Sequence, residues 1–360
     1  MTGERAATTQ PAGAVRKRGG DGVGLRDVAR AAGVSTATVS RAINAPDLVS
    51  AALRERITLA IDRLGWVPDG AAKALATRRS FAIGAVFPTL ATGDFARAAA
   101  AVQKELQGFG YTLLLACSEY DAEQELAQVR KFVERGVDGL ILVGRSHHEK
   151  LAAFLDRKAI PYVFSFVHDG LEGGVCIGPD NRKAMAALTN YLLELGHRTI
   201  AVIAQSTDNN DRARARLEGI RDALAVRGLA VRPQHMVTGR WTIEEGRELF
   251  RRLWATTPRP TAIICGNAHL AVGAIIESQA SGVAVPADVS IVSYDDIDIM
   301  SHLPATVTAL RVPGEDIGRN AARWLVGQVE GRELPVQFEH MPELLARDSS
   351  GPPRRDADSP

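Results

Sequence analysis

The sequence predicts an α/β protein in which a small all-α domain is followed by a larger, two-lobed body with parallel sheets. Residues 24–64 carry apolar side chains at helical spacing only, whereas from residue 81 onward short apolar runs alternate with amphipathic helical stretches. The length of 360 residues fits two or three domains, and the 46% hydrophobic content is enough for a sizeable core.

Three short helices are predicted within residues 23–67. Gly33 interrupts the periodic pattern between the first and second helices, and Ser50 is an N-cap candidate for the third. The apolar positions of the three helices are Leu25, Val28, Ala29 and Ala32, then Val39 and Ile43, then Leu53, Ile57, Ala60, Ile61 and Leu64. These positions predict a small bundle with little core.

The body, residues 81–347, is predicted to contain two α/β lobes. Its apolar runs lie at 83–87, 112–117, 139–143, 162–166, 199–204, 261–265 and 290–293, with helical stretches such as 122–134, 183–195 and 217–226 between them. Continuous apolar strands separated by helices are typical of a parallel sheet covered on both faces. A ligand is then expected at the carboxyl ends of the strands, in the crevice between the lobes.

Both ends of the chain lack periodic apolar positions. Residues 1–22 are rich in Gly, Ala, Thr and Arg, and residues 348–360 are polar and rich in proline. Such segments bury too little apolar surface to offset the entropy of ordering, so we predict a disordered leader at 1–22 and a disordered tail at 348–360.

Charge is distributed unevenly along the chain. Residues 1–80 hold 13 Lys and Arg against 7 Asp and Glu, whereas the remainder holds 30 against 35. A basic N-terminal region on a mildly acidic body indicates a polyanionic partner for the first region alone.

The sequence indicates a cytoplasmic protein without a membrane partner. No apolar stretch approaches the roughly 20 residues that span a bilayer, and no secretory signal is visible. The three cysteines, Cys117, Cys176 and Cys265, are far apart in apolar runs, so we expect buried thiols rather than a disulfide framework or a zinc site.

Residues 25–41 have the pattern of a helix-turn-helix. Small Ala29 lets two helices approach closely, Gly33 permits the tight turn, and Val34 and Val39 anchor the second helix. Small hydroxyls reach phosphates and an arginine guanidinium pairs with a guanine edge, so the second helix is a candidate for reading double-stranded DNA. Its outward residues are Ser35, Thr36, Ala37, Thr38, Ser40 and Arg41.

From Asp27 to Asn44 the chain reads D-V-A-R-A-A-G-V-S-T-A-T-V-S-R-A-I-N, and Leu64-Gly65-Trp66-Val67-Pro68 follows. In this it closely resembles the LacI/GalR family of bacterial transcriptional regulators, whose opening reads D-V-A-x-x-A-G-V-S-x-x-T-V-S-R-x-x-N. The resemblance implies that Thr36, Ala37 and Arg41 face bases. It implies further that the DNA backbone is held by Ser35, Thr38, Ser40 and Asn44.

Residues 68–80 correspond to the hinge of that family, a helix that forms on DNA. The family pattern P-N-x-x-A-R-x-L is here P-D-G-A-A-K-A-L, so Asp69 replaces Asn and Lys73 replaces Arg, which keeps the charge but loses the planar fork. The resemblance implies that Lys73 contacts DNA and that Leu75 is the wedge in the minor groove. The alternative is a plain helical linker with Leu75 in a core.

The resemblance extends through the body, with family marks at 136–141, 180–181, 196–200, 216–219, 286–290 and 294–296. It implies a body like the periplasmic sugar-binding proteins, which forms a homodimer and holds a sugar, sugar acid or sugar phosphate between its lobes. The site that it implies consists of Thr92, Asp94, Arg216, Trp241, Asn267 and Asp295. The alternatives are ordinary structural roles, such as a surface cation for Arg216 or a helix N-cap for Asp295.

Four positions depart from the family pattern. Asp94 replaces an aromatic residue, Phe166 an acidic one, Ala268 the Asp of an Asn-Asp pair, and Val312 a Gln. Losing carboxylates while Arg216 stays favours an anionic or phosphorylated ligand over a neutral disaccharide, although Asp94 argues the other way.

Enzyme and transport functions are not favoured. The body has no G-x-S-x-G elbow, phosphate-binding loop or dinucleotide fingerprint, and the spacing of His147, His148 and His269 supports no metal site. We therefore expect a repressor of transcription that is controlled by an effector and needs neither cofactor nor metal. The alternative is an effector-independent DNA-binding protein whose body serves only dimerisation.

Overall fold

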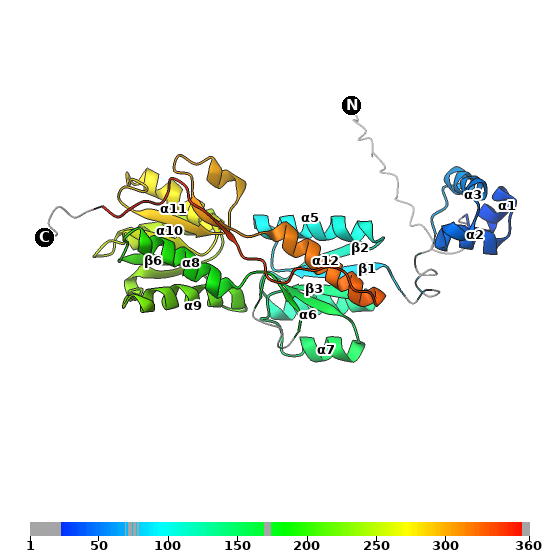
Figure 1. Ribbon diagram of the computed structural model, residues 1–360, viewed down its shortest axis with the longest axis horizontal. Coiled ribbons are helices and arrows are strands. Elements are labelled where there is room, and N and C mark those ends of the chain that lie inside the picture. The colour runs from blue at the N-terminus through cyan, green and yellow to red at the C-terminus, as the bar shows by residue number, and fades with distance from the viewer. Residues whose placement is uncertain are drawn as a thin grey trace, which may run out of the picture. The chain divides into compact units, whose positions relative to one another are not determined.

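The computed structural model describes residues 23–68, 70, 74, 77, 79–168 and 174–354 (Figure 1). The chain divides into two compact units, residues 1–78 and 79–360, and each is described by itself. The predicted leader at 1–22 and the hinge residues Lys73 and Leu75 lie outside the described residues.

The first unit holds the predicted helices, α1 (Leu25–Ala32), α2 (Thr36–Asn44) and α3 (Ala51–Leu64), with a short 3-10 turn η1 (Pro46–Leu48) between the last two. Gly33 ends α1 with a left-handed backbone, φ 62°, which glycine adopts without steric cost. The core of this unit is small, as predicted, and its buried side chains are Val28, Ala29, Ala32, Val39, Ile57 and Ala60.

The first lobe of the body is built on a five-stranded parallel sheet in the order β2-β1-β3-β4-β5. In Figure 1, α5 and α12 lie side by side on one face of this sheet, and α6 and α7 contribute to the core of the other face. The elements of this lobe are β1 (Ala82–Phe87), α5 (Gly93–Gly108), β2 (Thr112–Cys117), α6 (Ala122–Glu134), β3 (Gly139–Val143), α7 (Leu151–Lys158), β4 (Tyr162–Ser165), β5 (Cys176–Ile177) and α12 (Gly314–Glu330).

The second lobe is built on a six-stranded sheet in the order β11-β10-β9-β8-β6-β7, in which only β11 runs antiparallel. Helices α8 and α9 pack on one face, and α10 and α11 on the other. Its elements are α8 (Asn181–Glu194), β6 (Ile200–Gln205), α9 (Asp211–Val226), η2 (Pro233–His235), β7 (Met236–Gly239), α10 (Ile243–Trp254), β8 (Ala262–Cys265), α11 (Ala268–Ala280), β9 (Ser290–Tyr294), η3 (Asp298–Ser301), β10 (Thr308–Arg311) and β11 (Glu343–Leu345).

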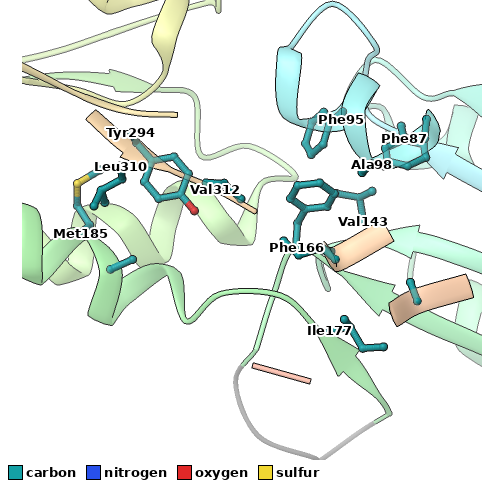
Figure 2. Packing of buried hydrophobic residues seen from close by; sticks show 14 of the residues in the cluster. Phe87, Phe95, Ala98, Val143, Phe166, Ile177, Met185, Tyr294, Leu310 and Val312 are labelled. Carbon is teal, nitrogen blue, oxygen red and sulfur yellow. The ribbon is translucent and has the colours of Figure 1, made fainter. Parts of the chain in front are cut away.

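The two lobes are interleaved in the chain. The chain passes to the second lobe between β5 and α8, returns between β10 and α12, and passes over again between α12 and β11. One continuous apolar cluster includes residues of both lobes, and Figure 2 shows part of it, with Phe95 and Phe166 on one side and Tyr294 and Leu310 on the other. The carboxyl ends of the parallel strands therefore meet where the lobes meet.

The prediction of a disordered tail from residue 348 is wrong as far as Arg354. Ser349 is fully buried beside the second sheet, where its carbonyl accepts a hydrogen bond from the Ile291 N–H (2.8 Å) and its hydroxyl accepts one from the Thr308 N–H (2.8 Å). The polar composition misled because Ser349 is ordered by backbone pairing and hydroxyl hydrogen bonds, which need no apolar side chain.

Helices long and apolar enough to cross a bilayer do not occur among the described residues.

Candidate functional site

The predicted DNA-reading residues lie on the first unit, along α2. Thr36, Ala37, Arg41 and Asn44 are exposed, whereas Val39 on the opposite side of the helix is completely buried. Val39 therefore fixes the rotation of α2 about its own axis, and the exposed residues are left to meet a partner.

The hydroxyl residues of α2 form two local hydrogen-bonded pairs. Ser35 caps the helix by accepting from the Thr38 N–H (3.1 Å), and the two hydroxyls are 2.8 Å apart. Asn44 donates to the Ser40 hydroxyl (3.3 Å). These contacts restrict the side chains that the family resemblance assigns to the DNA backbone, whereas Arg41 is exposed.

The second candidate site is a small cavity of about 30 Å³, partly open to solvent, at the carboxyl ends of the strands of both lobes. Five of the six predicted effector residues line it, namely Thr92, Asp94, Arg216, Asn267 and Asp295. The other residues around it are Phe95, Tyr120, Phe166, Asn181, Gln205, Asn210, Arg212, Tyr294 and Val312. A concave pocket in which four aromatic rings lie among convergent polar and charged groups is typical of a small-molecule site.

Arg216 is buried and held by neighbours of this chain. Its Nη1 donates to Asn181 Oδ1 (3.3 Å) and its Nη2 to Gln205 Oε1 (3.2 Å). Its guanidinium also lies over the ring of Tyr294, 4.3 Å from the centroid. The Tyr294 hydroxyl donates to the same Asn181 Oδ1 (2.8 Å), so the arginine is fixed in position before any ligand enters.

Two carboxyl groups from different lobes face each other at the cavity. Asp94, on the first turn of α5, is almost completely buried and pairs with Arg97. Burial raises the pKa of the Asp94 carboxyl well above its ordinary value, the facing Asp295 raises it further, and Arg97 opposes the shift. Burial also raises the pKa of Asp295, opposed by the Asp94 side chain and by the charge of Arg216.

Asn267 and Thr92 turn polar atoms without partners toward the same region. Asn267 caps α11 by accepting from the Leu270 N–H with Oδ1 (3.0 Å), but its buried Nδ2 has no hydrogen-bond partner among the described residues. The buried Thr92 Oγ1 and Asp94 Oδ2 are likewise unpartnered within the described part of the chain. Buried polar atoms normally have partners, so these three atoms mark a place where a ligand would supply them.

Trp241 does not line the cavity. Its ring instead packs against that of Tyr120, with centroids 4.8 Å apart, and Tyr120 is the ring that reaches the cavity. The family resemblance placed Trp241 at the cavity. It could not show that Tyr120 lies between Trp241 and the cavity.

Several lining residues were missed as binding residues. Asn181, Phe166, Tyr294 and Val312 lie within family marks or at departures from the family pattern, so a signal existed for them. No sequence signal singled out the remaining five, Phe95, Tyr120, Gln205, Asn210 and Arg212. Gln205, at the end of β6, could have been found because polar residues at the carboxyl ends of parallel strands face the ligand crevice.

Phe166 follows β4 with a left-handed backbone, φ 61°, which is unusual for a bulky side chain. Asn181 stabilises this conformation by donating from Nδ2 to the Phe166 carbonyl oxygen (3.0 Å). Asp295 follows β9 with φ 74° in the same region. Strained backbone at two strand ends beside one cavity is typical of a functional site.

A second set of contacts joins the lobes on the other side of the cavity. Asp211, the first residue of α9, accepts from the Arg145 N–H (2.9 Å), and Arg212 donates to the Val143 carbonyl oxygen (3.0 Å). Gly144 lies between these partners with φ 77°, and a Cβ there would come within 1.7 Å of the Arg212 guanidinium. These contacts join the first lobe to the N-terminal end of α9 in the second lobe.

Two of the three histidines raised by the sequence, His147 and His148, have carboxylate partners, whereas the buried Nδ1 of His269 has no hydrogen-bond partner among the described residues. His147 Nδ1 is 2.7 Å from Glu125 and His148 Nε2 is 2.9 Å from Glu123. Within the described residues, no group of three or more His, Cys, Asp or Glu side chains is arranged to hold a metal ion.

A helix-turn-helix unit with an exposed reading helix, followed by a two-lobed body with a ligand cavity, defines a class of protein: the ligand-responsive DNA-binding regulators. Comparison with known proteins identifies the family. Residues 24–69 match the model described as "Bacterial regulatory proteins, lacI family", and residues 80–344 match "Periplasmic binding proteins and sugar binding domain of LacI family".

Individual relatives agree. The HTH-type transcriptional repressor PurR of Erwinia tasmaniensis is 30% identical over 339 residues, which cover 90% of this chain and 96% of that protein. Among solved structures, the Lac repressor dimer bound to operator and the anti-inducer ONPF is 26% identical with a TM-score of 0.81, covering 92% of this chain and 100% of the other. The CelR–cellobiose complex is 30% identical with a TM-score of 0.67, covering 91% and 100%.

The chain therefore belongs to the LacI family of DNA-binding transcriptional regulators, a non-enzymatic family whose members pair a helix-turn-helix with an effector-binding domain. The predicted family, the fold class and the absence of enzymatic function are confirmed by these matches.

Proposed function

We propose that this protein is a repressor that binds a pseudopalindromic operator as a homodimer and changes its DNA affinity when a carbohydrate-type effector occupies the cavity between the lobes. The observation that carries the proposal is the set of unpartnered buried atoms on the cavity wall, at Thr92, Asp94 and Asn267. A body that served only dimerisation would gain nothing by leaving these atoms without hydrogen bonds.

The DNA-binding part rests on α2. Its exposed Thr36, Ala37 and Arg41 are chemically suited to base edges, with a methyl contact to thymine and a bidentate pair to guanine. Ser35, Thr38, Ser40 and Asn44 supply short polar groups for phosphates. Leu75 and Lys73 remain our candidates for the minor-groove wedge and a phosphate contact.

The proposal of a carbohydrate effector is supported by the residues that line the cavity and by the relative CelR. Aromatic rings such as Phe95, Phe166 and Tyr294 can pack on the apolar face of a sugar ring, while amide and carboxyl groups bind its hydroxyls. The similar CelR protein is described in complex with cellobiose, which supports the same class of effector here.

A homodimer is supported by the edge of the first sheet. Strand β2, with the sequence T-L-L-L-A-C, lies at this edge, and Leu115 is 40% exposed. Long apolar edge strands pair with foreign chains unless they are covered. We propose that a second copy of the body covers this edge, as the Lac repressor relative is described as a dimer.

Effector control follows from the contacts between the lobes. A ligand held by Asp94 of the first lobe and Arg216 of the second lobe favours one lobe angle over others by its differential affinity for them. A changed angle moves the start of the first lobe, where residues 68–80 enter, and so alters how two hinges can meet on DNA.

The test begins with selection of bound duplexes from a random pool by the full-length protein. We expect an enriched pseudopalindrome, bound at least about a thousandfold more tightly than random DNA at physiological salt. Fluorescence anisotropy then measures operator affinity with and without neutral sugars, sugar acids and sugar phosphates. Equal binding to all duplexes would overturn the assignment of α2 as the helix that reads DNA sequence. An operator affinity and a melting temperature that no probe changes would favour the effector-independent alternative.

A further inference from the structure

A separate cavity of about 230 Å³ lies within the first lobe, between α7 and the face of the sheet formed by β3 and β4. It is partly open to solvent, and among the described residues it shares no lining side chain with the cavity between the lobes. The lining residues are Leu142, Arg145, His147, His148, Leu151, Ala152, Leu155, Tyr162 and Phe164. An apolar cavity of roughly 150 Å³ holds one benzene ring, so this volume fits a single ring with a small substituent.

The lining favours a flat, aromatic ligand. Phe164 packs edge-on against Tyr162, with ring centroids 5.4 Å apart, and stacks on His147, with centroids 5.0 Å apart and an angle of 21° between the rings. A further planar ring can stack on such a cluster. The rest of the wall is mainly aliphatic, and its buried members are Leu142, Leu151 and Leu155.

The two histidines offer a ligand ring surface rather than hydrogen bonds. His147 Nδ1 lies 2.7 Å from Glu125, and its Nε2 lies 2.9 Å from the Gly144 carbonyl oxygen. His148 is held in the same way, by Glu123 and by the backbone two residues further on. All four ring nitrogens therefore have partners within the chain, and a polar group on the ligand must be bound by another side chain.

Arg145 supplies a permanent cation to this lining. Its guanidinium lies over the Phe164 ring, 5.5 Å from the centroid, and its Nη1 lies 3.1 Å from Cys176 Sγ. An arginine has five N–H donors and no acceptor, so it can bind a ligand acceptor as well as its protein neighbours. The described residues that line the cavity include no carboxylate. Because hydrogen bonds between a guanidinium and a carboxylate are stronger than neutral ones, the lining favours an acid.

We propose that this cavity is a second ligand site, which binds a small aromatic carboxylic acid with its ring against Phe164 and its carboxylate at Arg145. The site does not depend on the effector proposed for the cavity between the lobes. It lies beside a contact between the lobes, since the Arg145 N–H donates to Asp211 (2.9 Å). A bound acid would therefore contact a residue that the second lobe also holds.

The experiment uses the full-length protein and three acids, each with a neutral match that has the same ring. The pairs are benzoate with benzyl alcohol, 4-hydroxybenzoate with 4-hydroxybenzyl alcohol, and phenylacetate with 2-phenylethanol. Cyclohexanecarboxylate keeps the charge of benzoate without its flat ring. Thermal shift identifies the probes that bind, and calorimetry measures Kd. The melting temperature without ligand checks that each variant folds.

Two variants, each with a matched control, locate the site. Ala152→Phe fills the cavity from the exposed side of α7, whereas Ala153→Phe places the same ring on an exposed neighbour that does not line it. Arg145→Gln removes the cation, whereas Arg157→Gln removes an exposed arginine of α7 that is outside the lining. Hydrogen exchange of peptides from residues 139–165 locates the bound acid independently.

We expect at least one acid to bind wild type with a Kd of about 1 mM or tighter, and about tenfold more tightly than its alcohol. Ala152→Phe should abolish this binding. Arg145→Gln should weaken the acid about tenfold and leave the alcohol unchanged, while both controls should bind as wild type does. The bound acid should slow hydrogen exchange in peptides from residues 139–165.

An acid that binds Ala152→Phe as tightly as wild type would lie elsewhere, and this result would overturn the site. Equal affinity for an acid and its alcohol, or for benzoate and cyclohexanecarboxylate, would overturn the ligand class. If Ala152→Phe does not fold, Arg145→Gln and hydrogen exchange decide the location. Failure of all three acids to bind would overturn the whole inference, and the proposed repressor function would stand.

Discussion

The reading helix and the ligand cavity are built in opposite ways. The reading residues of α2 come from one short stretch, and several are exposed; within the described part of the chain their side-chain hydrogen bonds stay inside their own helix turn. The cavity residues come from positions 92 to 312, are mostly buried, and hold one another through Asn181, Arg216 and Tyr294. Substitutions of exposed residues without local hydrogen-bonding roles in the first region, such as Arg41, should therefore act on DNA binding, and substitutions in the second on stability and ligand response together.

The comparison predicts its largest effect at Arg216. Arg216→Ala should lower the free energy of unfolding by about 3 kcal/mol, because it leaves Gln205 Oε1 without its partner and removes the cation from the Tyr294 ring. Urea unfolding of the full-length protein measures this loss. Arg214→Ala is the matched control, an exposed arginine two residues earlier on α9. Equal losses in both variants would show that the cavity network is no more coupled than a surface position.

The same contrast explains what could be predicted from the sequence. The helix-turn-helix at residues 25–64, here called the head, could be placed residue by residue because its 18-residue motif is contiguous, and the buried Val39 then fixes which neighbours are exposed. Its hinge residues Lys73 and Leu75 stay predictions. In the body, the alternating pattern predicted two parallel sheets and hence the crevice in which five of six expected residues lie.

Contacts between segments far apart in the chain could not be predicted from the sequence. The neighbours of Arg216 were not predicted, because the pairing of Asn181 with residues near 205 and 294 depends on how α8, β6 and β9 pack. Trp241 was placed on the cavity wall for the same reason, whereas the structure has Tyr120 there. The ordered segment at Ser349 was missed because composition reports apolar burial, whereas this segment is held by hydrogen bonds.

In the head, Arg41 should give the largest effect on recognition. Arg41→Ala should cost about 1–3 kcal/mol on the selected operator, roughly tenfold to a hundredfold in Kd, because a bidentate base contact is lost. Stability should not change, since the side chain is exposed. Arg41→Lys keeps the charge without the planar fork, so it should retain affinity for random DNA and lose discrimination. Anisotropy on operator and random duplexes measures both. Equal loss on all sequences would make Arg41 a phosphate contact.

Ser35 tests whether the head also depends on its local hydrogen bonds. Ser35→Ala removes the N-cap acceptor of α2 and should destabilise the head by about 1 kcal/mol. Hydrogen exchange of peptides from residues 25–64 measures this without interference from the body. Thr36→Ala is the control, since this exposed neighbour makes no side-chain hydrogen bond among the described residues. Unchanged exchange in Ser35→Ala would show that the cap adds nothing to head stability.

The smallest expected effect is a pH dependence of stability that the body has and the head lacks. The eight histidines all lie beyond residue 80, and burial lowers the pKa of His197, whose Nε2 lies 2.9 Å from the Gly351 carbonyl oxygen. The folded body therefore holds His197 neutral, while the unfolded chain protonates it near pH 6.5, so its stabilising contribution is complete above that pH and falls as pH drops.

Between pH 7.5 and 5.5 the free energy of unfolding of the body should therefore fall as His197 becomes protonated in the unfolded chain. His197→Gln can still donate to the Gly351 carbonyl but cannot titrate, so its unfolding free energy should fall less steeply over this range. The difference between the two proteins removes the contributions of all other titrating groups, including the Asp94–Asp295 pair, whose raised pKa values act in the opposite direction. Hydrogen exchange of the head should stay constant over the same pH range once corrected for the intrinsic rate. Parallel pH curves for wild type and His197→Gln would mean that the pKa of His197 is the same in the folded body and in the unfolded chain, so that burial beside Gly351 does not favour the neutral ring.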